Sequence, residues 1–123
     1  MINLIASATS TPPNAVSTTD MIAAMLYKLS PELINTVSSI DDVSGCLIHT
    51  GSKKILDGVC AQLSVPVGSA KVRPSYEVLK NYGNLSSAST GFMLAEKNQR
   101  PGPAVVVGFG VGFTASAGVV NFN

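Results

Sequence analysis

Apolar residues follow two different spacings along this chain. Largely apolar runs predict strands at residues 2–8, 46–49, 104–109 and 113–122. Apolar positions at helical spacing predict helices at 17–29, 30–37 and 52–63. Ser52 should be the N-cap of the third helix, and Ile55, Leu56, Val59 and Leu63 should face the core. Two further segments are predicted to be short, a strand at 71–73 and a helical turn at 75–80.

The alternation of strands and helices predicts an α/β fold with a mixed, roughly five-stranded sheet and helices on both faces. The last two strands should be antiparallel and joined by a tight hairpin at Gly108–Phe113. A chain of 123 residues is expected to form one domain, 1–123, in which 1–16 supply a leading strand and loop.

The predicted helix at 85–95 carries no charged residue. A helix without a charged face is normally buried on all sides. Its small residues, which include Ser86, Ser87, Ala88 and Gly91, would allow other backbone segments to approach closely.

Composition limits the possible partners. The chain is 46% hydrophobic and 12% charged, and its scattered charges sum to only +1, so neither a basic face nor a nucleic-acid partner is expected. No apolar run has the length of a membrane span. The short apolar run at the N-terminus lacks a basic region and predicts a strand, not a signal peptide. Cys46 and Cys60 are too few for a disulfide framework or a zinc site, which predicts a reduced cytoplasmic setting and no metal.

The candidate chemistry lies in a histidine and an asparagine. His49 is the only histidine of the chain, and Asn84 follows Gly83 at the expected start of a helix. An imidazole and a carboxamide could together polarise a carbonyl oxygen. The structural alternatives are a histidine that is merely hydrogen-bonded and an asparagine that caps a helix.

Three segments in order, His49–Asp57, Tyr82–Ala88 and Gly108–Gly112, resemble the C-terminal half of the thiolase superfamily. The resemblance is greatest to 3-oxoacyl-[acyl-carrier-protein] synthase III and to chalcone-synthase-like type III polyketide synthases, and it runs from about Leu29 to Val120. The opening Ile5–Pro13 resembles the first strand and loop of the family's other half. The chain could therefore combine the beginning and the end of such an enzyme.

This resemblance implies a half-thiolase module that takes part in decarboxylative Claisen condensation of a malonyl thioester with an acyl thioester. It assigns His49 and Asn84 to the catalytic pair that binds the malonyl thioester carbonyl. The substrate-binding residues that it implies are Gly83, Gly108, Phe109, Gly110 and Gly112. Substrates would be thioesters of coenzyme A or of acyl carrier protein, and no cofactor is expected.

One part of the family's machinery has no counterpart in this sequence. The family's nucleophilic cysteine lies in the N-terminal half, at the start of a helix for which no matching segment exists here. Cys46 should point away from His49, because side chains alternate along a strand, and Cys60 lies on the following helix. Both are predicted to be small buried hydrophobic residues, so the chain alone is expected to be inactive in condensation.

The missing half bears on the expected partners. In the family, two halves sandwich a central helical layer, to which the uncharged 85–95 helix corresponds. We therefore expect the chain to pair with itself or with a separate cysteine-bearing N-terminal half, and acyl carrier protein is a possible further partner. Two hypotheses follow: half of a condensing enzyme, or a non-catalytic thiolase-like homodimer with a binding or interaction role.

Overall fold

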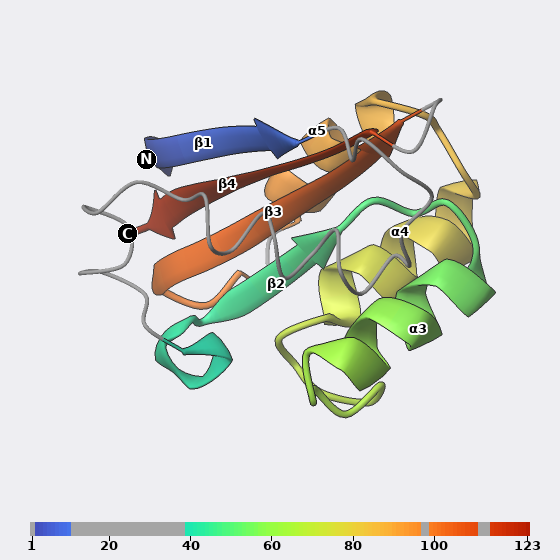
Figure 1. The fold of residues 1–123 in the computed structure, drawn as a ribbon, viewed down its shortest axis with the longest axis horizontal. Helices are drawn as coiled ribbons and strands as arrows, with labels where there is room; N and C mark the ends of the chain where they lie inside the picture. Colours follow the sequence, from blue (N-terminus) through green and yellow to red (C-terminus); the bar gives the residue numbers. More distant parts are fainter. Residues whose placement is uncertain (1, 11–38, 97–98, 111–113) are drawn as a thin grey trace.

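The structure is a computed structural model that describes residues 2–10, 39–96, 99–110 and 114–123 (Figure 1). The predicted helices at 17–29 and 30–37, and nearly all of the loop before them, lie outside these residues. The described elements are β1 (Ile2–Ser10), the 3-10 turn η1 (Ile40–Asp42), β2 (Gly45–Ile48), α3 (Lys53–Gln62), α4 (Arg73–Tyr82), α5 (Ala88–Leu94), β3 (Gly102–Gly110) and β4 (Thr114–Phe122). None of the described helices has the length and apolar character needed to cross a membrane.

The described strands form one mixed sheet in the order β1-β4-β3-β2. β4 pairs antiparallel with both β1 and β3, and β2 pairs parallel with β3 (Figure 1). The predicted α/β class, the mixed sheet and the antiparallel closing pair are confirmed. The sheet has four strands within the described residues, where the sequence predicted about five.

The outer edge of β2 explains this difference. The predicted strand at 71–73 is wrong, because Lys71 lies in a turn and Arg73 begins α4. The backbone N–H of Cys46 donates to the carbonyl oxygen of Lys71 at 2.7 Å, and that of Ile48 donates to Ser75 Oγ at 2.8 Å. The turn at Lys71 and the first turn of α4 thus supply hydrogen-bond acceptors for the N–H groups of Cys46 and Ile48 at this edge. These two N–H groups therefore need no further strand as a partner.

Helices cover both faces of the sheet, as predicted. On one face, Leu56, Val59 and Cys60 of α3 pack with Cys46 and Ile48 of β2. On the other face, buried side chains of α4, α5 and the strands form a second cluster, whose members are Leu47, Val78, Met93, Ala104, Val120 and Phe122. Figure 1 shows α5 behind the sheet and α3 beside β2.

Helix α5 is shorter than predicted. It spans Ala88–Leu94, not 85–95, because the residues after Gly83 first form a turn. Ser89 and Met93 are buried against the sheet, whereas Phe92 is 44% exposed. The ring of Phe92 lies against that of Tyr82, with 4.9 Å between the ring centroids. One side of this uncharged helix therefore remains open in the described part of the chain.

Candidate functional site

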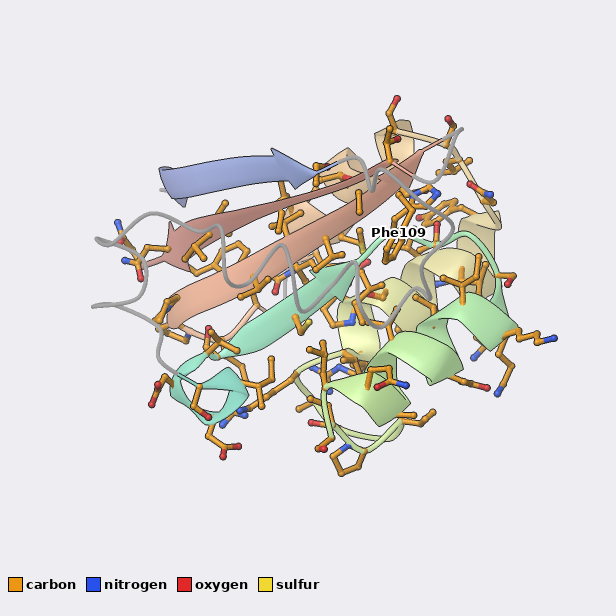
Figure 2. The ribbon with its side chains drawn as sticks, in the orientation of Figure 1. Phe109 is labelled. Carbon is orange, nitrogen blue, oxygen red and sulfur yellow. The ribbon has the colours of Figure 1, made fainter. Side chains whose placement is uncertain are left out.

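A cavity of about 740 Å³ lies at the carboxyl ends of the parallel strands β2 and β3. Open α/β sheets commonly bind ligands at this position. Phe109 lies at this end of the sheet (Figure 2). The lining residues come from the segments after β2 and α4 and from the β3–β4 pair: His49, Gly51, Ile55, Asn84, Ser86, Ser87, Thr90, Gly108, Phe109, Gly110, Thr114, Ala115 and Ser116.

His49 directly follows β2. Its backbone N–H donates to the carbonyl oxygen of Val107 at 2.8 Å, which extends the parallel pairing by one residue and brings His49 beside Gly108. Its side chain is partly buried, and this burial lowers the pKa of the imidazole from its ordinary value of 6.5. The ring is therefore neutral at pH 7 and carries one N–H donor.

Asn84 reaches the cavity from the turn between α4 and α5. Gly83 ends α4 at φ +74°, a conformation that favours glycine. The Asn84 amide nitrogen donates to the carbonyl oxygen of Gly51 at 3.3 Å, and its oxygen accepts from the backbone N–H of Ser86 at 2.9 Å. The Asn84 side chain thus caps a turn that precedes α5. The amide nitrogen has two protons, so one donor is left for a ligand.

The structure brings together five of the seven predicted site residues, because His49, Asn84, Gly108, Phe109 and Gly110 all line the same cavity. Two predicted residues do not belong to this set. Gly83 lies outside the lining and shapes the turn that presents Asn84. Gly112 lies outside the described residues.

Gly108 and Gly110 belong to β3, which corrects the predicted hairpin turn beginning at Gly108. They pair with Ser116 and Thr114 on β4. A Cβ atom would lie 2.9 Å from Ser116 Oγ if it were added at Gly108, and 2.6 Å from Thr114 Oγ1 if it were added at Gly110. A side chain at either position would therefore require the facing hydroxyl group of β4 to move.

The described lining carries no ionisable side chain apart from His49. It includes Ile55, which the sequence placed in the core but which is 40% exposed and lines the cavity. Ser86, Ser87 and Thr90 also line the cavity and were not predicted as site residues, although Ser86 and Ser87 lie within the Tyr82–Ala88 motif. Among the described residues, no group of three or more histidine, cysteine or acidic side chains could hold a metal ion.

Both cysteines of the chain lie away from this cavity. Cys46 and Cys60 are fully buried in the cluster on the α3 face, as predicted, whereas Leu47 belongs to the cluster on the opposite face. Burial and the neighbouring Cys60 raise the pKa of the Cys46 thiol to about 12. A thiol in this state is a poor nucleophile, because the reactive form is the thiolate.

Known proteins match this chain over most of its length. Residues 35–122 match a family described as "3-Oxoacyl-[acyl-carrier-protein (ACP)] synthase III C terminal". The β-ketoacyl-[acyl-carrier-protein] synthase III of Porphyra umbilicalis is 36% identical over 89 residues, which cover 68% of this chain and 26% of that protein. The 3,5-dihydroxyphenylacetyl-CoA synthase of Amycolatopsis balhimycina is 36% identical over 86 residues, which cover 66% of this chain and 23% of that protein.

Solved structures agree on the fold. The C-terminal type III polyketide synthase domain of Steely1 from Dictyostelium superposes with a TM-score of 0.77 at 21% identity, covering 98% of this chain and 40% of that chain. A fungal type III polyketide synthase gives a TM-score of 0.79 at 18% identity, covering 99% of this chain and 41% of that chain.

The sheet, its covering helices and these matches define a thiolase-like α/β domain. The chain belongs to the 3-oxoacyl-[acyl-carrier-protein] synthase III family and corresponds to its C-terminal part. The resemblance seen in the three sequence motifs is therefore confirmed. The chain spans about a quarter of the length of the curated relatives that it matches.

Proposed function

We propose that this chain is the C-terminal half of a condensing enzyme similar to β-ketoacyl-[acyl-carrier-protein] synthase III. In this proposal, it supplies His49 and Asn84 for decarboxylative Claisen condensation of a malonyl thioester with an acyl thioester. One observation carries the proposal: an imidazole and a carboxamide line one cavity that is otherwise free of ionisable groups in the described residues. Substrates would be coenzyme A or acyl-carrier-protein thioesters, and no cofactor takes part.

The proposed step uses two hydrogen-bond donors on one oxygen. The thioester carbonyl accepts from the His49 ring N–H and from the second amide proton of Asn84. When carbon dioxide leaves, the electron pair of the broken carbon–carbon bond passes to the α-carbon and is shared with that oxygen as an enolate. Donors that are already in place at that oxygen stabilise this developing charge.

Carbon–carbon bond formation needs an acylated thiol. The enolate attacks the acyl carbonyl, forms the new bond and expels the thiolate. Cys46 and Cys60 are both buried away from the cavity, so we assign the nucleophile to a separate N-terminal half. This chain alone is then inactive in the complete condensation. Its partners would be that half, a second copy of itself or acyl carrier protein, in a reducing cytoplasm.

A second candidate function is a non-catalytic, homodimeric thiolase-like protein with a binding or interaction role. The burial of both cysteines and the exposed ring of Phe92 on α5 support this alternative. The two candidates differ in whether the cavity catalyses loss of carbon dioxide from a malonyl thioester.

Decarboxylation of radiolabelled malonyl-coenzyme A by the full chain tests the proposal, because this step needs no acylated cysteine. We expect His49→Ala and Asn84→Ala each to lower the rate by about 100-fold or more, the usual effect of removing one such donor. Asn81→Ala is the matched control, since it removes an exposed carboxamide of α4 outside the cavity. A wild-type rate no higher than that of both variants would contradict the proposal and favour the non-catalytic alternative.

A further inference from the structure

Two buried hydroxyl groups connect the segments that carry His49 and Asn84. Thr50 directly follows His49, and Ser89 lies in the first turn of α5; both are fully buried. The hydroxyl of Thr50 donates to Ser89 Oγ at 2.7 Å and lies 3.3 Å from the carbonyl oxygen of Gly83. The backbone N–H of Leu85 donates to the same Ser89 oxygen at 3.2 Å.

These contacts hold the backbone on both sides of Asn84. Gly83 precedes Asn84 and Leu85 follows it, and both meet the hydroxyl pair. The other described hydrogen bond between the two segments, from the Asn84 amide to the carbonyl oxygen of Gly51, is exposed and 3.3 Å long. Hydrogen bonds are stronger in dry surroundings, and a buried hydroxyl that loses its partner is costly. The Thr50–Ser89 hydrogen bond, which is buried and 2.7 Å long, is therefore the firmer connection.

We infer that Thr50 and Ser89 are positioning residues that fix the separation of the His49 and Asn84 donors. The inference rests on the proposed function, because it concerns how this pair meets a substrate carbonyl. Neither hydroxyl lines the cavity, so neither touches the substrate. Their effect on the reaction passes through the placement of Asn84 relative to His49.

The first test measures decarboxylation by variants of the full chain. We expect Thr50→Val and Ser89→Ala to lower kcat by about 10- to 100-fold with little change in KM, since small misplacements of catalytic groups have effects of this size. Thr50→Ser keeps the hydroxyl and should stay near the wild-type rate. Ser44→Ala is the matched control, because its hydroxyl donates to the Pro103 carbonyl oxygen at 2.9 Å at the far end of β2.

A double-mutant cycle separates positioning from general loss of structure. If Thr50 acts through Asn84, Thr50→Val should cause little further loss of rate in an Asn84→Ala background. An equal fold-loss in both backgrounds would overturn the inference. If His49→Ala and Asn84→Ala impair the reaction while Thr50→Val and Ser89→Ala do not, the inference fails and the proposed function stands.

An activity-independent measurement covers the case in which the proposed function fails. The side-chain amide signals of Asn84 can be assigned by NMR through their loss in Asn84→Ala. We expect Thr50→Val and Ser89→Ala to shift these signals, and Thr50→Ser and Ser44→Ala to leave them in place. Unshifted Asn84 signals in Thr50→Val would overturn the inference whatever the rates show.

Discussion

The imidazole of His49 is held in its neutral form by its surroundings. Partial burial disfavours the charged ring and lowers its pKa from the ordinary value of 6.5. A neutral ring donates through one nitrogen only, so its tautomer and orientation decide whether the donor reaches a substrate. The position of the ring after β2 thus matters as much as the presence of a histidine.

An NMR titration of the His49 ring protons should therefore give a midpoint below 6.5. The signal is unambiguous, because the chain contains one histidine, and His49→Ala should remove it. Between the folded-state pKa and 6.5, the unfolded chain binds more protons than the folded one, so the free energy of unfolding should fall as the pH falls through this window. A midpoint at or above 6.5 would contradict this prediction, and one above 6.5 would show that the fold stabilises the charged ring.

Some of the site residues could be predicted from sequence and others could not. His49 and Asn84 each stand within a recognisable segment. Thr50 and Ser89 are 39 residues apart, and neither has a local pattern that marks it as buried or paired. Helical spacing placed Ile55 on the inner face of α3, but spacing alone does not separate a residue in the core from one that lines a cavity.

The outer edge of β2 depends on one side chain of α4. Ser75 is fully buried, and its hydroxyl accepts a hydrogen bond from the backbone N–H of Ile48 at 2.8 Å. Ile48 is the last residue of β2 and immediately precedes His49. The first turn of α4 therefore fixes the end of the strand from which the histidine emerges.

Replacement of Ser75 by alanine should lower the free energy of unfolding by about 1–3 kcal/mol, because it leaves the buried N–H of Ile48 without its partner. Denaturant unfolding followed by circular dichroism would measure the change. Ser87→Ala is the control: this exposed serine makes no capping hydrogen bond, and its loss should change stability by less than about 0.5 kcal/mol. Equal effects of the two substitutions would show that Ser75 does not support the edge.

The predicted elements were most accurate where periodicity and a terminal signal agreed. The helix expected at 52–63 is α3, and Ser52 caps it by accepting from the backbone N–H of Ile55. The strand expected at 71–73 is wrong. Lys71 lies in a turn, although its carbonyl oxygen accepts a hydrogen bond from Cys46 as a strand residue would. The residue pattern does not distinguish such a turn from a short strand. The glycines of β3 were assigned to a turn, because cross-strand crowding by Ser116 and Thr114 becomes apparent only in the folded sheet.

Two exposed aromatic residues lie on the open side of α5. The rings of Phe92 and Tyr82 meet there at an interplanar angle of 51°, and the two residues are 44% and 53% exposed. Exposed apolar surface of this kind commonly marks an interaction site. We propose that this α5 surface is where the chain meets its partner, and that in its absence a second copy takes that place.

Light scattering over a range of concentrations tests this pairing on the purified chain. The wild type should form a dimer or larger assembly, and Phe92→Lys should shift it toward the monomer, because a lysine charge buried at the contact would lose its water without gaining a partner. Val67→Lys is the matched control, since Val67 is equally exposed, at 46%, but lies in the loop after α3. A monodisperse wild-type monomer would contradict self-association. An assembly that Phe92→Lys leaves intact would show that the copies meet through another face.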